Sequence, residues 1–379
     1  MTDLALTALE IAAVRAPLEH AALLPAKVYS DPGIFRLERE RLFPAGWLPV
    51  CHLSDLNTPG SYVARHLIGE PVVAIRDRGG DIRVLSNVCR HRNTALVSGQ
   101  GSCTGNRIIC PYHGWTYGLD GQLLAAPFMD DIEDFVRRDI RLPQLRHDIW
   151  HGFVFVNLDG GAPPLGEMLA DLEPLIAPYR FEDMQRFELK RTRVQWNWKI
   201  SLENFSEAYH QPWVHPATAE KDFPARKAEY FDTNNAYSMF RLHQGNGEIF
   251  PLFAEPVPGI ADAYRRFVTV CNIYPYFHSL TDAATPLVLD FNIFDENEHE
   301  MVWSLLMPQG TGDDPALDEK LSGFRAFIEP IMTEDVTICS GIAQGVQSRF
   351  TAQGRLSRME KAIHQFHNWW LDRMLAPVA

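Results

Sequence analysis

Two cysteine–histidine pairs constrain this chain of 379 residues more than any other feature of its sequence. Cys89 and His91 stand two positions apart in NVCRHRN, and Cys110 and His113 stand three apart in CPYHGW. Thiolates and imidazoles are the ligands that proteins use for zinc and for iron–sulfur centres. The two short segments are therefore predicted to form loops whose four side chains close around one metal site.

The way in which the ligands are divided favours iron over zinc. Zinc fingers usually pair cysteine with cysteine and histidine with histidine, whereas here each loop carries one of each kind. This division lets the two cysteines hold one iron and the two histidines the other, as in a Rieske [2Fe–2S] centre. A structural zinc ion remains the alternative.

The segments around the loops predict a small all-β module. PVVAIRD (71–77) and IRVLSNV (82–88) are rich in β-branched residues and flank a turn with two glycines, which is typical of a hairpin. WTYGL and QLL flank Asp120-Gly121, the dipeptide of a tight primed turn. Both cysteine–histidine loops are thus expected at the ends of strands.

A second group of candidate metal ligands follows in NWKISLENFSEAYHQPWVHP (197–216). His210 and His215 are five positions apart, about 140° around an α-helix, so they converge only if the helix ends between them. Pro212 is predicted to end it, since proline interrupts the helical hydrogen-bond ladder. Two histidines and one carboxylate would form a facial triad that leaves open positions on Fe(II).

With these motifs the sequence resembles the large (alpha) subunit of Rieske non-haem iron oxygenases. In that family an acidic residue ahead of a glutamine on a late helix completes the triad. The resemblance implies this role for Asp335, which precedes Gln344 in PIMTEDVTICSGIAQGVQ (330–347), with Glu334 as the near rival. Ser340 and Gly341 depart from the family, which has an acidic residue between the two.

The resemblance also implies a role for Glu207, and the helical spacing of Asn204, six residues before His210, indicates one for that residue. Glu207 takes the position of the acidic residue that links the mononuclear histidine of one subunit to a Rieske histidine, here His113, of its neighbour. A glutamate at this position resembles the branch of choline, glycine betaine and carnitine monooxygenases. Asn204 is expected to face the iron pocket. Glu207 also reads as a solvated helix charge, and Asn204 as a surface amide.

The predicted fold class is α+β. We expect a helical segment over residues 1–45 that packs on the catalytic domain, an all-β Rieske domain over 46–157 and a mononuclear iron domain over 158–379. Strand-like runs at 268–274, 286–294 and 300–308 predict an antiparallel sheet with flanking helices, of the helix-grip type. Ser357 and Glu360 form a capping box that opens a C-terminal helix.

The net charge and the composition limit the kinds of partner that this protein is expected to bind. The formal net charge of −13 repels polyphosphates, so no nucleic-acid partner is expected. No apolar run approaches the ~18 residues of a membrane helix, and the first ten residues have acidic rather than basic side chains, so we expect a cytoplasmic protein without membrane contact. The sequence has no nucleotide-binding glycine loop, so a separate NAD(P)H-dependent reductase, with or without a ferredoxin, must supply electrons. The resemblance implies a head-to-tail homotrimer and is compatible with a small added β subunit.

The function predicted is that of a terminal oxygenase that uses O₂ to monooxygenate a small quaternary-ammonium substrate. Five aromatic residues are candidates for a cation–π cage: Tyr274, Tyr276, Phe277, Trp213 and Phe250. The alternative substrate is an arene or aromatic acid, which an arginine such as Arg241, Arg265, Arg266 or Arg349 would bind. Two other classes of protein also carry such ligands: a non-catalytic Rieske electron-transfer protein and a zinc-stabilised interaction protein. The remaining histidines, His278 among them, have no partner pattern.

Overall fold

The computed structural model describes residues 4–245 and 254–376. Contacts divide the chain into two units. One is continuous and spans residues 45–165, and the other joins the preceding N-terminal segment to everything from residue 166 onward. None of the helices in the described ranges has the length and apolar character needed to cross a membrane.

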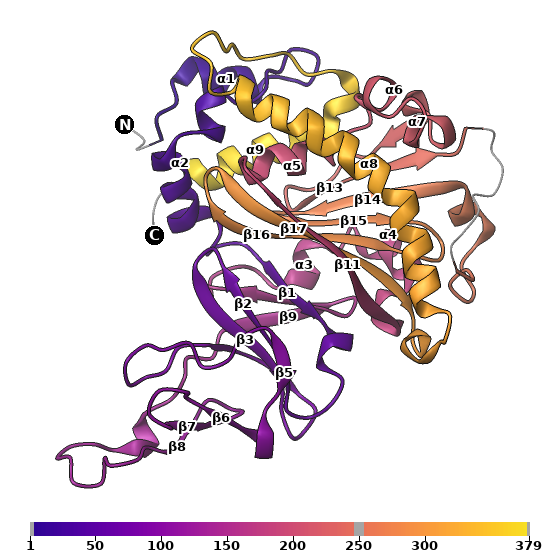
Figure 1. The fold of residues 1–379 in the computed structure, drawn as a ribbon. Coiled ribbons are helices and arrows are strands. Elements are labelled where there is room, and N and C mark those ends of the chain that lie inside the picture. Colours follow the sequence, from indigo (N-terminus) through magenta and orange to yellow (C-terminus); the bar gives the residue numbers. More distant parts are fainter. Residues whose placement is uncertain (1–3, 246–253, 377–379) are drawn as a thin grey trace. The chain divides into compact units, whose positions relative to one another are not determined.

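The continuous unit is built from three small antiparallel sheets (Figure 1). Their strands, in the order in which they pair, are β1 (Leu48–His52), β10 (Phe153–Asn157) and β9 (Arg146–Trp150); β4 (Ile82–Ser86), β3 (Glu70–Arg76), β2 (Ser61–Leu67) and β5 (Gln100–Ser102); and β6 (Arg107–Ile109), β7 (Thr116–Gly118) and β8 (Leu123–Ala125). Both predicted hairpins are present, as β3–β4 and β7–β8. Gly121 has a φ of 85°, the left-handed conformation that the second turn requires.

The other unit contains a seven-stranded antiparallel sheet (Figure 1). In spatial order its strands are β11 (Met184–Val194), β17 (Glu298–Pro308), β16 (Leu287–Asp295), β15 (Phe277–Thr281), β14 (Phe267–Ile273), β13 (Tyr237–His243) and β12 (Ala228–Tyr230). The three strand-like runs of the sequence correspond to β14, β16 and β17. Side chains at alternate positions of β13, β14 and β15 share one face of this sheet.

Helices flank the large sheet, and the predicted α+β class is confirmed. They are α1 (Ala8–Arg15), α2 (Pro32–Leu37), α3 (Leu165–Met168), α4 (Glu173–Ile176), α5 (Trp198–Asn204), α6 (Gln211–Val214), α7 (Ala219–Asp222), α8 (Leu317–Gly345) and α9 (Lys361–Leu375). The long helix α8 runs along the sheet and contacts both α5 and α6 (Figure 1). The capping box of Ser357 and Glu360 forms immediately before α9.

The break between α5 and α6 differs from the prediction. Helix α5 ends at Asn204, and residues 205–210 form turns rather than helix. Pro212 does not end a helix, because it occupies the first turn of α6, where a missing N–H costs no hydrogen bond. The chain therefore leaves α5 at Asn204 and forms the short helix α6 before His215. The two predicted iron ligands lie on either side of α6, His210 directly before it and His215 directly after it.

The N-terminal segment is fixed to the large-sheet unit by a buried ion pair. Glu38, which follows α2, accepts a hydrogen bond from Lys199 Nζ at 2.6 Å, and both side chains are 0 % exposed. Two indoles, Trp198 and Trp370, donate to the same carboxylate at 3.1 and 2.6 Å. Burial lowers the pKa of Lys199, while the charge of Glu38 opposes that shift. The carboxylate is therefore stabilised by one cation and two neutral donors.

Lys199→Met is expected to lower the free energy of unfolding by about 3–5 kcal/mol, because it leaves the buried carboxylate of Glu38 without its counter-charge. Lys190→Met is the matched control, since the ion pair of Lys190 with Glu329 is exposed and contributes about 0–1 kcal/mol. Chemical denaturation of both variants measures the difference. Equal losses in the two variants would contradict the structural role of the buried pair.

Candidate metal centres

The two cysteine–histidine loops repeat one backbone conformation. In the first, the N–H of Cys89 donates to Thr94 O at 2.9 Å and its carbonyl accepts from Asn93 N at 3.0 Å. In the second, the N–H of Cys110 donates to the carbonyl of Trp115 at 2.8 Å and its own carbonyl accepts from Gly114 N at 3.1 Å. Both loops have a positive φ four residues after the cysteine, 56° at Asn93 and 70° at Gly114. Asparagine and glycine tolerate that conformation best.

These loops place thiols and imidazoles on opposite sides of one site. Cys89 and Cys110 are buried in the core of the domain, whereas His91 and His113 are exposed, with ring centroids 4.7 Å apart. The ring of His91 stacks on Trp115, with the planes 7° from parallel. The hydroxyl of Tyr117 lies 3.3 Å from Cys89 Sγ. The four predicted ligands therefore come together, with the sulfurs inside and the imidazoles at the surface.

The electrostatics of the thiols fit a bound cluster. Burial raises the pKa of Cys110, and the neighbouring thiol of Cys89 raises it further. Two adjacent buried thiols release their protons easily only when a cation takes their place, and iron binds the thiolate form. Together with the pair of exposed imidazoles, this donor set fits a Rieske [2Fe–2S] cluster better than four equivalent zinc ligands.

A second group of candidate ligands lies in the large-sheet unit. His210, His215 and Asp335 each offer one ligand atom, and these atoms all lie within 4.8 Å of one another. Asp335 Oδ1 is 2.9 Å from His215 Nε2 and 3.6 Å from His210 Nε2. His210 comes from the turn before α6, His215 follows α6, and Asp335 lies in the middle of α8. Two imidazoles and a carboxylate in this arrangement fit an iron facial triad.

Each histidine of the group is oriented by a second carboxylate on its other nitrogen. His210 Nδ1 is hydrogen-bonded to Glu207, and His215 Nδ1 lies 2.7 Å from Glu334 Oε2. Glu334 also accepts from Thr218 Oγ1 at 2.8 Å. This pattern leaves both Nε2 atoms directed toward Asp335, as expected of imidazoles that bind a metal through one nitrogen and are oriented through the other.

Burial alone would lower the pKa of His215, but the hydrogen bonds and charges of Asp335 and Glu334 outweigh it and raise that pKa. The two carboxylates thus favour the protonated form of His215, whose positive charge lies between them. A divalent metal ion would supply the same charge, and its binding would release the proton. The charge balance of the group therefore fits an Fe(II) site.

The structure separates the roles of the two rival acidic residues. Asp335 is buried and lies near Nε2 of both histidines. Of the two histidines Glu334 contacts His215, at Nδ1. Asp335 lies far from either end of the 29-residue helix α8, so it is not a cap. The geometry thus favours Asp335 as the third ligand. No pattern in the sequence indicates the supporting role of Glu334, which contacts Nδ1 of His215 while Asp335 contacts Nε2.

A cavity of about 400 Å³ opens beside the three ligands. Its floor is the face of the sheet that presents Phe240, Val270 and Leu280, and its walls come from α8 and from the segment after α5. Asn204 lines it, as predicted for a residue facing the iron pocket, and its Nδ2 has no partner in the described structure. The cavity gives a substrate direct access to the candidate iron site.

The four candidate cage residues that the structure describes do not form an aromatic cage at the cavity. Tyr274, Tyr276 and Phe277 are buried in the core and do not line the cavity, while Trp213 is 83 % exposed. Phe250 lies outside the described residues. In the described part of the chain the cavity is lined by the phenylalanine rings of Phe205, Phe223, Phe240, Phe324 and Phe327.

Two family patterns match most of the chain. The Rieske [2Fe–2S] domain matches residues 46–136, and the catalytic domain of the ring-hydroxylating alpha subunit matches residues 181–376. The carnitine monooxygenase oxygenase subunit of Escherichia coli (strain K12) is 29 % identical over 378 residues, which covers 92 % of this chain and 93 % of that protein.

Solved structures show the same architecture. A quaternary ammonium Rieske monooxygenase in complex with L-carnitine superposes with a TM-score of 0.76 at 25 % identity, covering 94 % of this chain and 95 % of that one. Naphthalene 1,2-dioxygenase from Rhodococcus sp. superposes with a TM-score of 0.81 at 21 % identity, covering 94 % and 95 %. The second likeness concerns the fold alone.

Proposed function

The chain belongs to the family of ring-hydroxylating oxygenase alpha subunits, and from this premise we propose that it monooxygenates a small quaternary-ammonium substrate. It is the catalytic subunit of a Rieske-type oxygenase, with a [2Fe–2S] cluster and a mononuclear iron as cofactors. Two of the relatives named above support the substrate class: one is a carnitine monooxygenase oxygenase subunit, and the other is a quaternary ammonium Rieske monooxygenase in complex with its substrate L-carnitine.

The residues proposed to hold the cofactors are Cys89, His91, Cys110 and His113 for the cluster, and His210, His215 and Asp335 for the iron. When bound, the cluster and the iron supply one-electron transfer and O₂ activation. The protein itself orients the imidazoles through Glu207 and Glu334 and lines the reaction space with phenylalanine rings. Those rings limit the access of water to the reacting centre.

The charge of the cavity carries the proposal of a cationic substrate. Asp335 and Glu207 belong to the proposed iron site, where the charge of the metal offsets theirs. The rest of the lining in the described residues carries two more carboxylates, Asp222 and Asp282, against the ammonium of Lys221. Burial raises the pKa of Asp282, and the N–H groups of Ala284 and Thr285, which donate to its Oδ1, offset part of that rise. An acidic cavity with aromatic walls attracts an ammonium ion through charge and cation–π contacts.

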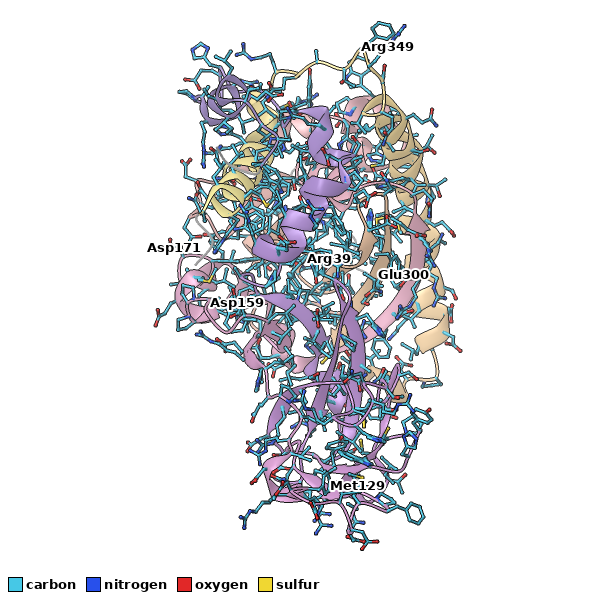
Figure 2. All side chains as sticks on the ribbon, turned by 90° about the vertical axis from the view of Figure 1, so that its left-hand side faces the viewer. Arg39, Met129, Asp159, Asp171, Glu300 and Arg349 are labelled. Atoms are coloured by element: carbon cyan, nitrogen blue, oxygen red, sulfur yellow. The ribbon has the colours of Figure 1, made fainter. Side chains whose placement is uncertain are left out.

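An arginine that would hold an aromatic carboxylate is absent from the cavity lining in residues 4–245 and 254–376. Arg241 packs instead over the ring of Phe267, with 4.3 Å to the centroid. Arg349 lies on the loop that follows α8 (Figure 2) and packs on Phe350. These positions weigh against the aromatic-acid alternative.

A single turnover tests the substrate class. Chemically reduced, iron-loaded protein is mixed with O₂ and a pool of betaines, carnitine-like amines and aromatic acids, and products are identified by mass spectrometry. The proposal expects an aldehyde together with a demethylated or cleaved amine. A hydroxylated ring or a cis-diol, without amine products, would contradict it.

We propose further that Glu207 joins neighbouring subunits of a head-to-tail trimer, as the family resemblance implies. Its carboxylate holds His210 Nδ1, and Tyr209 and Trp213 beside it are exposed, which leaves an apolar surface for a second copy. His113, exposed at the tip of its own loop, is the residue that would meet Glu207 from that copy. A reductase remains the proposed electron donor, and this is consistent with the relatives being oxygenase subunits of larger systems.

Glu207→Gln is expected to leave both metals bound and to lower product formation by about 10–100-fold or more, because the amide orients His210 less firmly and carries no charge. Reductase-coupled turnover and iron content are measured together. Glu229→Gln is the matched control, since Glu229 also binds a histidine, His243, at 2.9 Å, but on the surface. Normal turnover in the Glu207 variant would remove the proposed role.

A further inference from the structure

A row of three polar side chains lies on the sheet face that forms the cavity floor, and one of them, His278, lines the cavity. Ser238, Asn272 and His278 are partners in register on β13, β14 and β15. All three are fully buried, whereas the next cavity-facing row consists of Phe240, Val270 and Leu280. Burying three polar groups on an apolar surface is costly unless each is hydrogen-bonded.

The hydrogen bonds of this row fix which nitrogen of His278 carries a proton. The hydroxyl of Ser206 donates to Leu202 O at 2.5 Å, so its oxygen is free to accept from Asn272 Nδ2 at 3.1 Å. The same Nδ2 donates to Ser238 Oγ at 3.2 Å. The remaining atom, Asn272 Oδ1, is an acceptor and contacts His278 Nδ1, which must therefore carry the hydrogen.

The second nitrogen of His278 is left as a bare acceptor. Burial lowers the pKa of His278 to about 3, so the ring is neutral near pH 7 and Nε2 has a free lone pair. His278 lines the cavity and is 0 % exposed, and Nε2 has no hydrogen-bond partner in the described part of the chain. The ring packs on Phe205, 5.3 Å between centroids, which restricts its rotation.

We propose that His278 Nε2 accepts a hydrogen bond from a hydroxyl group of the substrate and so makes the enzyme prefer hydroxylated over deoxy quaternary-ammonium compounds. This inference rests on the proposed function for the ammonium part. A quaternary nitrogen has no N–H, so the donor must lie elsewhere on the substrate, and a hydroxyl is the smallest group that supplies one. Asn272 acts as the positioning residue, because it holds the imidazole in the accepting tautomer.

The size of the preference follows from the burial of Nε2. A hydroxylated ligand would supply the hydrogen bond that the buried Nε2 lacks, whereas a deoxy ligand would leave this acceptor unpaired, and sites built in this way discriminate strongly. We expect the hydroxylated member of a matched pair to bind about 10–100-fold more tightly. The preference should not change between pH 6 and 8, because the imidazole stays neutral there.

The test measures dissociation constants by calorimetry for the iron-loaded protein with two pairs of ligands. The quaternary-ammonium pairs are choline with ethyltrimethylammonium, and L-carnitine with γ-butyrobetaine. His278→Leu removes the acceptor and is expected to reduce the preference to about twofold or less. His278→Gln is expected to retain most of it, since the amide of glutamine can donate to Asn272 and accept from the ligand.

His299→Gln is the matched control. His299 is also a fully buried histidine of the same sheet, but both its nitrogens are bonded, to Ser201 Oγ and Trp196 O at 2.9 Å each, and it does not line the cavity. This variant is expected to keep the preference of the wild type. A loss of preference in it would point to a general effect on packing and would overturn the role of His278.

A third pair, 2-phenylethanol and ethylbenzene, separates this inference from the proposed function. If no quaternary-ammonium ion binds but 2-phenylethanol is preferred and His278→Leu removes the preference, the substrate class fails and the role of His278 stands. If the two members of each quaternary-ammonium pair bind with equal affinity, the role of His278 is overturned and the substrate class stands. Absence of any preference in all three pairs also overturns it.

Discussion

Replacing Asp335 by asparagine is expected to lower the iron content from about three to about two per chain and to abolish product formation. Asp335 is the only one of the three grouped residues that adds negative charge, and an amide binds Fe(II) far more weakly than a carboxylate. The two irons that remain belong to the cluster, so the visible spectrum and the electron paramagnetic resonance signal of the reduced cluster should be unchanged. Iron analysis and spectroscopy on the same preparation measure both effects.

Glu334→Gln is the matched neighbour for this experiment. Glu334 carries the same charge one position earlier, but it contacts the outer nitrogen of His215 rather than the centre of the group. Its variant should keep about three irons per chain at high iron concentration and bind the mononuclear iron about 10–100-fold more weakly. If Glu334→Gln lost the iron outright while Asp335→Asn kept it, the assignment of the two residues would be reversed.

Cys110→Ala is expected to remove the red-brown colour, the cluster's resonance signal and all reductase-dependent turnover. Two thiolates are needed to hold one of the two irons, and alanine has no ligand atom to offer at the buried position of Cys110. The mononuclear iron should remain, because its ligands lie in the other unit of the chain. Turnover driven by chemical reduction should therefore also be lost, since the electron relay is missing.

Cys103→Ala provides the control in the same domain. Cys103 is half-buried and packs at the edge of the core that contains Cys89 and Cys110. Its replacement removes a thiol of the same domain without touching the two loops, so colour and turnover should persist. A colourless Cys103 variant, or a coloured Cys110 variant, would refute the assignment of the cluster ligands.

The sequence was most informative where the chemistry is local. Both cysteine–histidine loops are short, residues 89–94 and 110–115, and backbone hydrogen bonds between the first and last residue close each of them. Spacing alone therefore predicts which side chains converge. The hairpins beside the loops were predictable for the same reason, because Asp120-Gly121 specifies its own turn.

The mononuclear site was predicted in its members but not in its geometry. Proline is compatible with both the end and the beginning of a helix, and in this chain Pro212 begins one. The choice between Asp335 and Glu334 depends on the rotation of α8 against His215, which is a property of tertiary packing. Glu207 contacts His210 as expected, but across a turn rather than along a helix.

The cavity could not be predicted from the sequence, because it is lined by alternate residues of strands whose order in the sheet is not encoded locally. Aromatic residues are frequent in both cores and ligand sites, and Tyr274, Tyr276 and Phe277 belong to the core. His278 directly follows them and faces the opposite side of β15 from Phe277, into the cavity. A single position along a strand thus separates a packing residue from a recognition residue.

The division of the chain into a continuous and a discontinuous unit has a consequence for the order of biosynthesis. The cluster ligands fall within 25 consecutive residues of a unit that is complete once residue 165 has been made. The iron ligands span residues 210–335, and the unit that holds them also needs the N-terminal segment, which must wait for α5 and α9. During translation the Rieske domain can therefore fold and become ready for its cluster first, while Glu38 stays unpaired until Lys199 emerges. The iron site is expected to mature last, after α9 has been made.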